Sequence, residues 1–460
     1  MKRIALLLFC CLLSLLSFGQ EPDSIQRPEK NASAFWSVIF QQYDMPEYYQ
    51  RKGYNHRLRG VINKRCKIYL EEISRIAYGD PYVQDYVQGI FTRVTPTKLN
   101  PNLPLNLNIR IFQFPEPDVF ILPNGTLLIS TGMLCTLDSE EELEAILANE
   151  MAHYVLDHSI YNVHRTEQRI KRAATWGTVL SVVGFVADAV SVATIDDSYH
   201  HKNHVSDFAA LVSVGATIGS VASIATADAA INSQAVNHLG LTYKRNQEKT
   251  ADQIVKQYLT YNNMNPDALA SALTKIRRYY IAEGKTSDLP RFESCKALQK
   301  RIKAIGESNA EFPQNHFYRK SVSAVATFNA TMYLNDRQYK QAEKLVQKNI
   351  DQYLASANDY VILVKARMAQ ENSPESNEAC MLLLDKARKM SANTNLDINK
   401  QEILLLLRMK KQTRAADALQ QYMEMLRDYA QQDKLVDDER RWIEEETRWA
   451  EKTLDQIHLL

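Results

Sequence analysis

The chain lacks an excess of charge of either sign. Its 460 residues include 55 Lys and Arg against 54 Asp and Glu, which gives a formal net charge of +1. Because proteins that bind nucleic acid usually carry a strongly basic surface, this balance predicts no nucleic-acid partner. The 45% apolar and 24% charged content is typical of a globular protein, and the length suits two or three domains.

Cysteine is also scarce, and no pair has the CxxC spacing of redox or metal motifs. Of the six cysteines, two lie in an apolar run at the N-terminus, and four are scattered: Cys66, Cys135, Cys295 and Cys380. Four distant cysteines in a long chain do not form a disulfide framework. We therefore expect buried free thiols.

The N-terminus has the pattern of a secretory signal. Lys2 and Arg3 precede an apolar run over 4–16, and small residues at Ser17 and Gly19 mark a cleavage site. The run is too short to be a good membrane span. We expect a signal peptide over 1–19, a polar linker over 20–33, and export to the periplasm. Acylation at one of the signal cysteines is less favoured, because much of the apolar run would lie after the cut.

A small sheet is expected after a helical segment that ends near Arg93. Apolar and polar residues alternate over 105–111, as in a half-buried strand. Two further apolar runs, 119–122 and 126–130, flank Asn124-Gly125, a pair that favours a tight hairpin turn. We expect the strand over 126–130 to lie at the sheet edge, where it could bind an extended peptide.

The next helix begins with a capping pattern. Ser139 is followed three residues later by Glu142, and an apolar stripe then runs along the helix to Val155. Asn149 and His153 are four residues apart and therefore project from one face, with Glu150 beside them.

This spacing is that of a metallopeptidase helix with one change. In an HExxH helix two histidines bind one zinc ion, and the glutamate activates a metal-bound water. Here the segment reads Asn149-Glu150-Met151-Ala152-His153, so asparagine stands at the first ligand position.

The surrounding motifs resemble one known family. They comprise Pro123-Asn124-Gly125, Gly132-Met133-Leu134, the run from Leu137 through Leu143, Ala148 to His153, and the Arg-x-x-Glu-x-x-Ala-Asp spacing of Arg245, Glu248, Ala251 and Asp252. The chain is thus similar to the zinc metallopeptidase family of HtpX, the CAAX prenyl proteases and BepA. The resemblance implies an α+β fold, with a mostly helical gluzincin-type metallopeptidase core and a small β-sheet, and zinc as cofactor.

The resemblance also assigns roles to single residues. Glu150 would be the general base, and His153 and Glu248 would be zinc ligands. Asp252 would orient the first-ligand side chain, and Arg245 would be a charge partner close to the site. Asn149 interrupts this set, because an asparagine amide almost never binds zinc. Cys295-Lys296 also stands where the family usually carries Thr-His-Pro.

Three replacements for the missing ligand are conceivable. Asp157 lies one turn beyond His153, and Cys295 would be a soft ligand if it reached the cleft. A third source is the histidine group His200, His201 and His204, although these residues fit a solvated loop better than a metal site. The competing interpretation is an inactive relative that keeps the helix for packing.

Two apolar stretches lie between the motifs, within an insertion over about 173–231. Their length approaches that of a bilayer span, but Asp188 and Asp228 interrupt them. We favour a buried or lid-like helical hairpin over a membrane hairpin, and membrane association stays open.

The last third predicts an all-α helical-repeat domain. Ala342, Ala379 and Ala416 recur at equal spacing, and Leu345, Leu382 and Leu419 keep the same register. Such pairs are typical of tetratricopeptide-like repeats. We expect a metallopeptidase-like domain over 34–317, repeats over 318–460, and a closing helix from Asp437.

Two functions from different classes follow. The first is an exported metalloendopeptidase-like protein of the cell envelope, acting on polypeptides in protein quality control with an impaired zinc site. The second is a catalytically inactive relative that binds peptides or proteins through the edge strand and the repeats.

Overall fold

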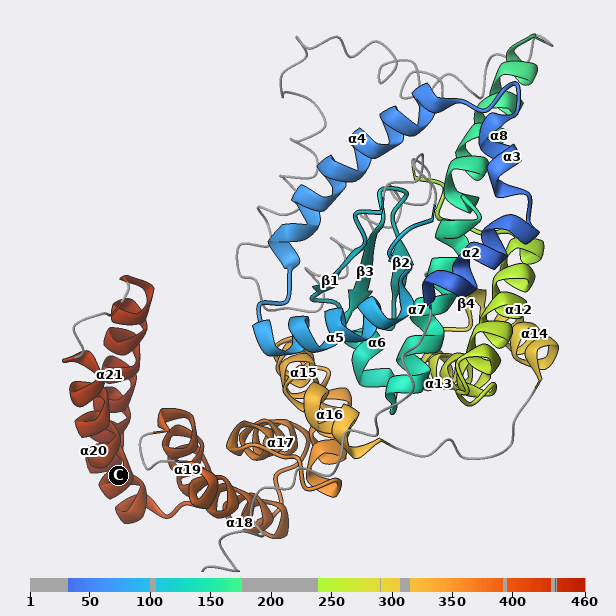
Figure 1. The fold of residues 1–460 in the computed structure, drawn as a ribbon. Coiled ribbons are helices and arrows are strands. Elements are labelled where there is room, and N and C mark those ends of the chain that lie inside the picture. The colour runs from blue at the N-terminus through green and yellow to red at the C-terminus, as the bar shows by residue number, and fades with distance from the viewer. Residues whose placement is uncertain are drawn as a thin grey trace, which may run out of the picture.

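The computed structural model describes residues 32–99, 105–175, 239–289, 291–306, 315–391, 395–431, 435 and 437–459. The expected signal peptide and nearly all of the linker lie outside the described residues, as does the insertion beyond residue 175. The described part is mostly helical with one three-stranded sheet and one short two-stranded sheet, which confirms the α+β class. Figure 1 shows a globular part that contains the three-stranded sheet and, attached to it, an extended row of helices.

The N-terminal helices cover one side of the globular part. They are α2 (Ala32–Gln42), α3 (Met45–Gln50), α4 (His56–Ile73), the 3₁₀ turn η1 (Ser74–Ile76) and α5 (Pro81–Val94). The Trp36 indole donates a hydrogen bond to the Val94 carbonyl at 2.7 Å and so ties α2 to the end of α5. Asp80 is the N-cap of α5 and precedes a proline in the first turn. Both residue types are favoured at these positions of a helix.

The three-stranded sheet has the order β1-β3-β2. β1 (Asn108–Phe112) pairs in parallel with β3 (Thr126–Ser130), and β2 (Val119–Ile121) pairs with β3 in the antiparallel sense. The prediction that 126–130 is an edge strand is therefore wrong. β3 is central and buried at every residue. This is because β1, which precedes the hairpin in the chain, pairs with the side of β3 that the hairpin leaves open.

The hairpin between β2 and β3 is confirmed. Gly125 has φ +93°, a conformation that side chains with a Cβ rarely adopt, and its N–H donates to the Leu122 carbonyl at 2.9 Å. The Leu122 N–H donates to Thr126 at 2.8 Å and continues the ladder.

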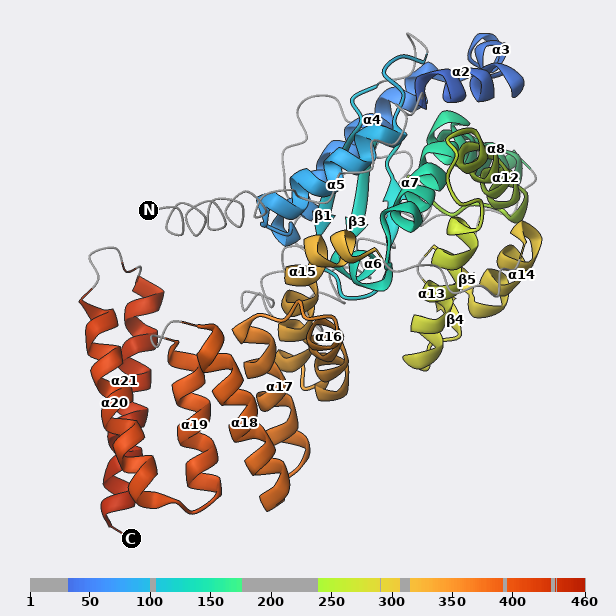
Figure 2. The same cartoon turned by 60° about the horizontal axis from the view of Figure 1, so that its bottom comes forward.

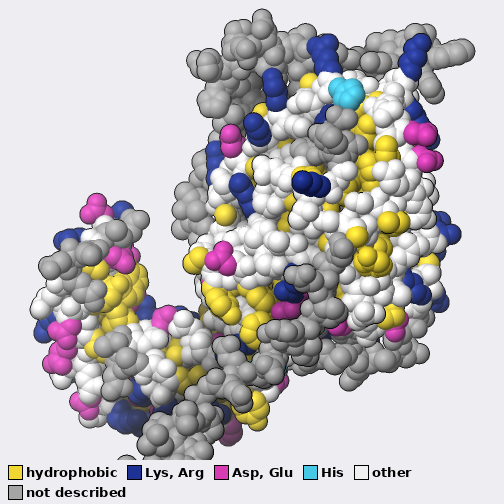
Figure 3. Space-filling view, in the orientation of Figure 1, with side chains coloured by type: hydrophobic (Ala, Val, Ile, Leu, Met, Phe, Trp, Pro, Cys, Tyr) yellow, Lys and Arg dark blue, Asp and Glu magenta, His cyan; other side chains and the backbone are white. Residues whose placement is uncertain are grey.

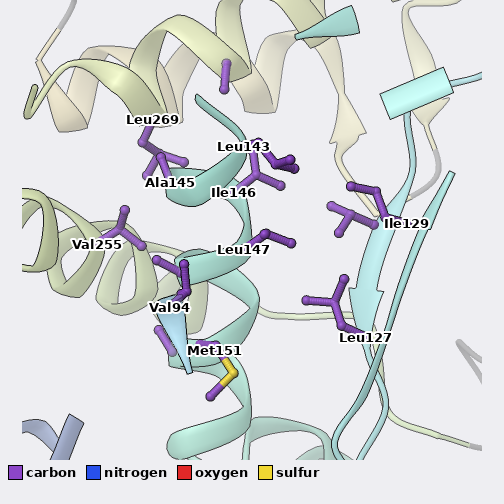
Figure 4. Packing of buried hydrophobic residues seen from close by; sticks show 14 of the residues in the cluster. Val94, Leu127, Ile129, Leu143, Ala145, Ile146, Leu147, Met151, Val255 and Leu269 are labelled. Atoms are coloured by element: carbon purple, nitrogen blue, oxygen red, sulfur yellow. The ribbon is translucent and has the colours of Figure 1, made fainter. Parts of the chain in front are cut away.

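Helix α7 (Glu140–Val155) is the centre of the globular part. It follows α6 (Thr131–Thr136) and packs with the sheet on one side and with α12 (Arg245–Tyr261) and α13 (Ala268–Ala282) on the other. Figure 4 shows Leu127 and Ile129 of β3 on one side of α7, and Val255 and Leu269 on the other. Burial on several faces explains why the whole stretch from Glu142 to Val155 is buried.

The remaining elements of the globular part flank α12 and α13. They are α8 (His158–Thr175), β4 (Ser287–Leu289), β5 (Glu293–Ser294) and α14 (Cys295–Ile305). The four described cysteines are buried and free, as expected. Within the described ranges, no helix combines the length and apolar character that crossing a membrane requires.

Seven helices form the row at the C-terminal end. They are α15 (His316–Asn335), α16 (Tyr339–Asp351), α17 (Ala357–Gln370), α18 (Pro374–Met390), α19 (Leu396–Arg408), α20 (Gln412–Ala430) and α21 (Asp437–His458). Each packs against the next in the chain, and Figure 2 shows them standing side by side. In Figure 3, hydrophobic side chains show between these helices and on the inner side of the α20–α21 pair.

The predicted register of the repeats is wrong in the second unit and one residue off in the third. Ala342 and Leu419 are buried, but Ala379 and Leu382 are exposed. Counted from the helix starts, the buried counterparts of Ala342 are Asn377 and Ala415. The units therefore differ in length, and equal spacing of small residues did not identify equivalent positions.

Buried contacts join the two parts of the chain. The Tyr318 hydroxyl donates to the Leu134 carbonyl at 2.9 Å, and α15 packs on α6. Asp138, just before α7, lies 2.7 Å from Lys348 of α16 and 2.7 Å from Lys275 of α13. One carboxylate thus links the globular part to the row of helices.

Candidate active site

Asn149, Glu150 and His153 are all buried on α7, with 6%, 7% and 1% of their surface exposed. The helix begins as the capping pattern predicted, since the Ser139 hydroxyl accepts from the Glu142 N–H at 3.2 Å. The Glu142 carboxylate, however, accepts from the Asp138 N–H rather than from Ser139. The helix is thus fixed at its start and presents the three side chains inside the protein.

The Glu150 carboxylate contacts the sheet. Its Oε2 accepts a hydrogen bond from the Ile121 N–H of edge strand β2 at 3.1 Å. Burial, and next the nearby charge of Glu248, raise the pKa of Glu150 to about 8. A raised pKa makes this carboxylate a stronger proton acceptor when it is ionised, and it also increases the protonated share near neutral pH.

Glu248 and Asp252 lie one turn apart on α12 and face α7. The Asn149 amide donates from Nδ2 to Asp252 Oδ1 at 3.1 Å, and His153 Nε2 lies 3.6 Å from Glu248 Oε2. The structure therefore brings together five of the six residues selected from the sequence, as two facing pairs beside Glu150.

Arg301 of α14 binds both carboxylates, a role that was not predicted from the sequence. Its guanidinium donates to Asp252 at 3.1 and 2.7 Å and lies 2.9 Å from Glu248 Oε2. Although burial acts in the opposite direction, the charge of Arg301 holds the pKa of Glu248 at about 2. In the sequence, Arg301 stands in a helical segment with regularly spaced apolar residues. Its carboxylate partners lie about fifty residues earlier in the chain, so the sequence alone does not pair them.

His158 and Tyr243 complete the surroundings of His153. His158 Nδ1 lies 2.9 Å from His153 Nδ1, so one ring donates and the other accepts. Burial, and next His153, lower the pKa of His158 to about 3, which keeps this ring neutral. The Tyr243 ring stacks on His153 with centroids 3.6 Å apart. Neither residue was predicted from the sequence, although His158 follows closely in the chain.

Comparison with known proteins agrees with this arrangement. The model of peptidase family M48 matches residues 81–316, which is just over half of the chain and includes α7, α12 and α14. The chain belongs to peptidase family M48. It is also similar to the mitochondrial metalloendopeptidase OMA1 of Bos taurus, with 34% identity over 55 residues, 12% of this chain. That match spans only 10% of the length of the OMA1 protein.

Family M48 peptidases are zinc metalloproteases, so the donor set can be tested against zinc. His153 Nε2 is buried without a hydrogen-bond partner, as a zinc-binding nitrogen would be in metal-free protein. Glu248 Oε2, 3.6 Å away, is the second donor. The third is missing, because Asn149 stands at the first ligand position with its amide N–H on Asp252, and an asparagine amide almost never binds zinc. A zinc site for catalysis needs three protein ligands, and these residues do not supply them.

The conceivable replacement ligands lie in other contacts. Asp157 is buried in an ion pair with Arg59 and accepts from Tyr54. Cys295 starts α14, with its sulfur 3.5 Å from the Lys285 carbonyl. The His200 group lies outside the described residues. Among the residues that the structure describes, no three His, Cys, Asp or Glu side chains converge as a metal site requires.

Arg245 lies at the start of α12, one turn before Glu248. It is the first residue of α12 and is exposed, lining a groove beside the site. The guanidinium that contacts Glu248 and Asp252 is that of Arg301.

Proposed function

We propose that this chain is a non-catalytic member of family M48 that uses the metallopeptidase fold to bind polypeptides. The observation that carries the proposal is the hydrogen bond from Asn149 to Asp252. In this bond the Asn149 amide stands in for a histidine on the carboxylate that would otherwise orient a metal-binding ring, and an asparagine amide almost never binds zinc.

The charges of the site support this proposal. Asp252 and Glu248 bring two carboxylates into the interior, and Arg301 contacts both. The Arg301 guanidinium therefore neutralises part of the negative charge that a bound metal would otherwise balance. Glu150, bonded to the Ile121 N–H, fits a structural role between α7 and the sheet.

One observation favours a second candidate, a metalloendopeptidase that works with an unusual ligand set. His153 Nε2 is buried, makes no hydrogen bond and lies close to Glu248. Family membership and the similarity to the OMA1 metalloendopeptidase point in the same direction.

The test is the zinc content of the purified protein beside its Asn149→His variant. We expect little zinc in the unaltered protein, near-stoichiometric zinc in the variant, and casein cleavage by the variant only. Near-stoichiometric zinc in the unaltered protein that disappears on His153→Ala would refute the non-catalytic proposal. Glu150→Gln in the Asn149→His background is the matched control, since it keeps the shape of the side chain and removes the general base.

Location and partners also belong to the proposal. The signal pattern at the N-terminus supports export to the periplasm, and the row of helices after α15 offers a surface for a protein partner in envelope quality control. Fractionation of cells that express the full chain tests the location, and a cytoplasmic protein with an intact N-terminus would contradict it.

A further inference from the structure

A groove lies between α12 and α14, beside the candidate active site. It has a volume of about 480 Å³, and its inner wall is formed by Glu248, Asp252 and Arg301. Since Glu248 and Asp252 are already bound to Arg301, the wall offers no free pair of carboxylates to a cation.

The rim of this groove is basic. Arg245 and Lys249 are exposed one turn apart on α12, and Lys300 is exposed on α14. Within the described ranges, no acidic side chain forms an ion pair with any of these three. Glu293 is the one acidic residue of the lining outside the Arg301 cluster. Figure 3 shows Lys and Arg side chains along the right edge, over the position of α12 and α14 in Figure 1.

The basic surface continues past the start of α12. A smaller hollow next to it is lined by Arg165, Arg169 and Lys244 together with neutral residues only. Positive charges that lie this close on a protein surface repel one another. An anionic partner would relieve this repulsion.

Part of the groove lining is apolar. Phe292 is buried, and Ala297 and the exposed Ala304 lie two turns apart on α14, where their small side chains leave room. Lys256 closes the far end, since its ammonium donates to the Ile305 carbonyl at 3.0 Å. From Arg245 to Lys256, α12 rises about 16 Å, enough for about five residues of extended chain.

We propose that this groove binds an acidic segment of a polypeptide, about five residues long, with apolar side chains interspersed. Its carboxylates pair with Arg245, Lys249 and Lys300, and its apolar side chains lie on Phe292, Ala297 and Ala304. The inference deepens the proposed binding function and rests on it.

A peptide fits better than a lipid surface for a geometric reason. The cations stand on two helices with an apolar trough between them, whereas a membrane is flat and would meet only the rim. The edge of β2 is a poorer peptide site, because the Ile121 N–H is already bonded to Glu150.

The experiment is fluorescence anisotropy with the purified protein. The probe is a fluorescein-labelled hexapeptide that alternates leucine and glutamate, beside the same peptide with glutamine for glutamate. We expect binding of the acidic peptide only, and weaker binding as salt is raised from about 50 to about 300 mM. Lys249→Glu with Lys300→Glu should weaken binding at least about tenfold.

Lys389→Glu, an exposed charge reversal on α18, is the matched control and should leave binding unchanged. Circular dichroism confirms that each variant is folded. Equal binding of the glutamine peptide, or unaltered binding by the double variant, would overturn the proposal. So would binding of phosphatidylglycerol vesicles, lost in the double variant, when the acidic peptide does not bind. The zinc measurement is independent, so failure here does not decide whether the protein is catalytic.

Discussion

The Asn149 side chain donates its amide N–H to Asp252 across the interface between α7 and α12. This contact makes the substituted position part of a connected polar cluster, because Asp252 also accepts from Arg301, which in turn binds Glu248. In this cluster each of the two α12 carboxylates contacts the Arg301 guanidinium. The stability of the cluster is open to direct measurement.

Arg301→Ala should destabilise the protein strongly. The change leaves Glu248 and Asp252 buried without their cation, and removal of one member of a buried pair costs about 3 kcal/mol. The unfolding midpoint in urea checks this. Lys303→Ala, an exposed lysine of the same helix, should change the free energy of unfolding by less than about 0.5 kcal/mol.

The cost of Arg301→Ala should shrink when Glu248→Gln and Asp252→Asn are already present, since no buried charge is then left unpaired. An equal cost in both backgrounds would show that Arg301 acts by packing alone.

His158→Ala should weaken zinc binding when a metal site has been restored. His158 lies 2.9 Å from His153 through Nδ1 of both rings, and such partners fix the orientation of a metal-binding histidine. In the Asn149→His background we expect about 10- to 100-fold weaker zinc affinity, measured by competition with a chromogenic chelator. His164→Ala, which removes a histidine of the same helix that bonds Gln168, is the control. Unchanged affinity in the His158 variant would remove His158 from the site.

Asp138 should make stability depend on pH. Burial raises its pKa, but Lys348 and Lys275 lower it more, and the net shift is below the ordinary value of 3.8. A carboxyl with a lowered folded-state pKa stabilises the protein above its unfolded pKa, and this stability is lost as pH falls through the folded value. Asp138→Asn should therefore cost about 2 kcal/mol at pH 7, and the difference from the unaltered protein should vanish below its folded-state pKa.

Calorimetric unfolding at several pH values between about 2 and 7 measures this effect. Asp85→Asn, an exposed aspartate of α5, should show no comparable difference at pH 7. A constant difference between Asp138→Asn and unaltered protein across the range would contradict an electrostatic origin.

The sequence predicted the elements whose signals are local. The hairpin at Gly125, the cap of α7 at Ser139 and the shared face of Asn149 and His153 all follow from residues within one or two turns of each other. The facing of α7 and α12 was predicted through family motifs, because the two segments are about a hundred residues apart.

Contacts that depend on the tertiary arrangement were not predictable in this way. The central position of β3 depends on its parallel pairing with β1, which no turn signal marks. Arg301 reaches Glu248 and Asp252 only because α14 packs on α12. The second repeat unit was misaligned because equal spacing was assumed, whereas the helix starts set which residues face inward.

The register of that unit gives a last prediction, on two leucines of α18. Leu384 has 1% of its surface exposed and packs with residues of α17 and α19, whereas Leu382 has 65% exposed. Leu384→Ala should cost about 2 to 5 kcal/mol, because it leaves a cavity, and Leu382→Ala should cost less than about 0.5 kcal/mol. Hydrogen–deuterium exchange reads this out locally: amides of α17 to α19 should exchange faster in Leu384→Ala, while those of α7 stay protected. If Leu382→Ala caused the larger increase, the equal 37-residue spacing of the alanines would give the correct register, and the burial of α18 would be wrong.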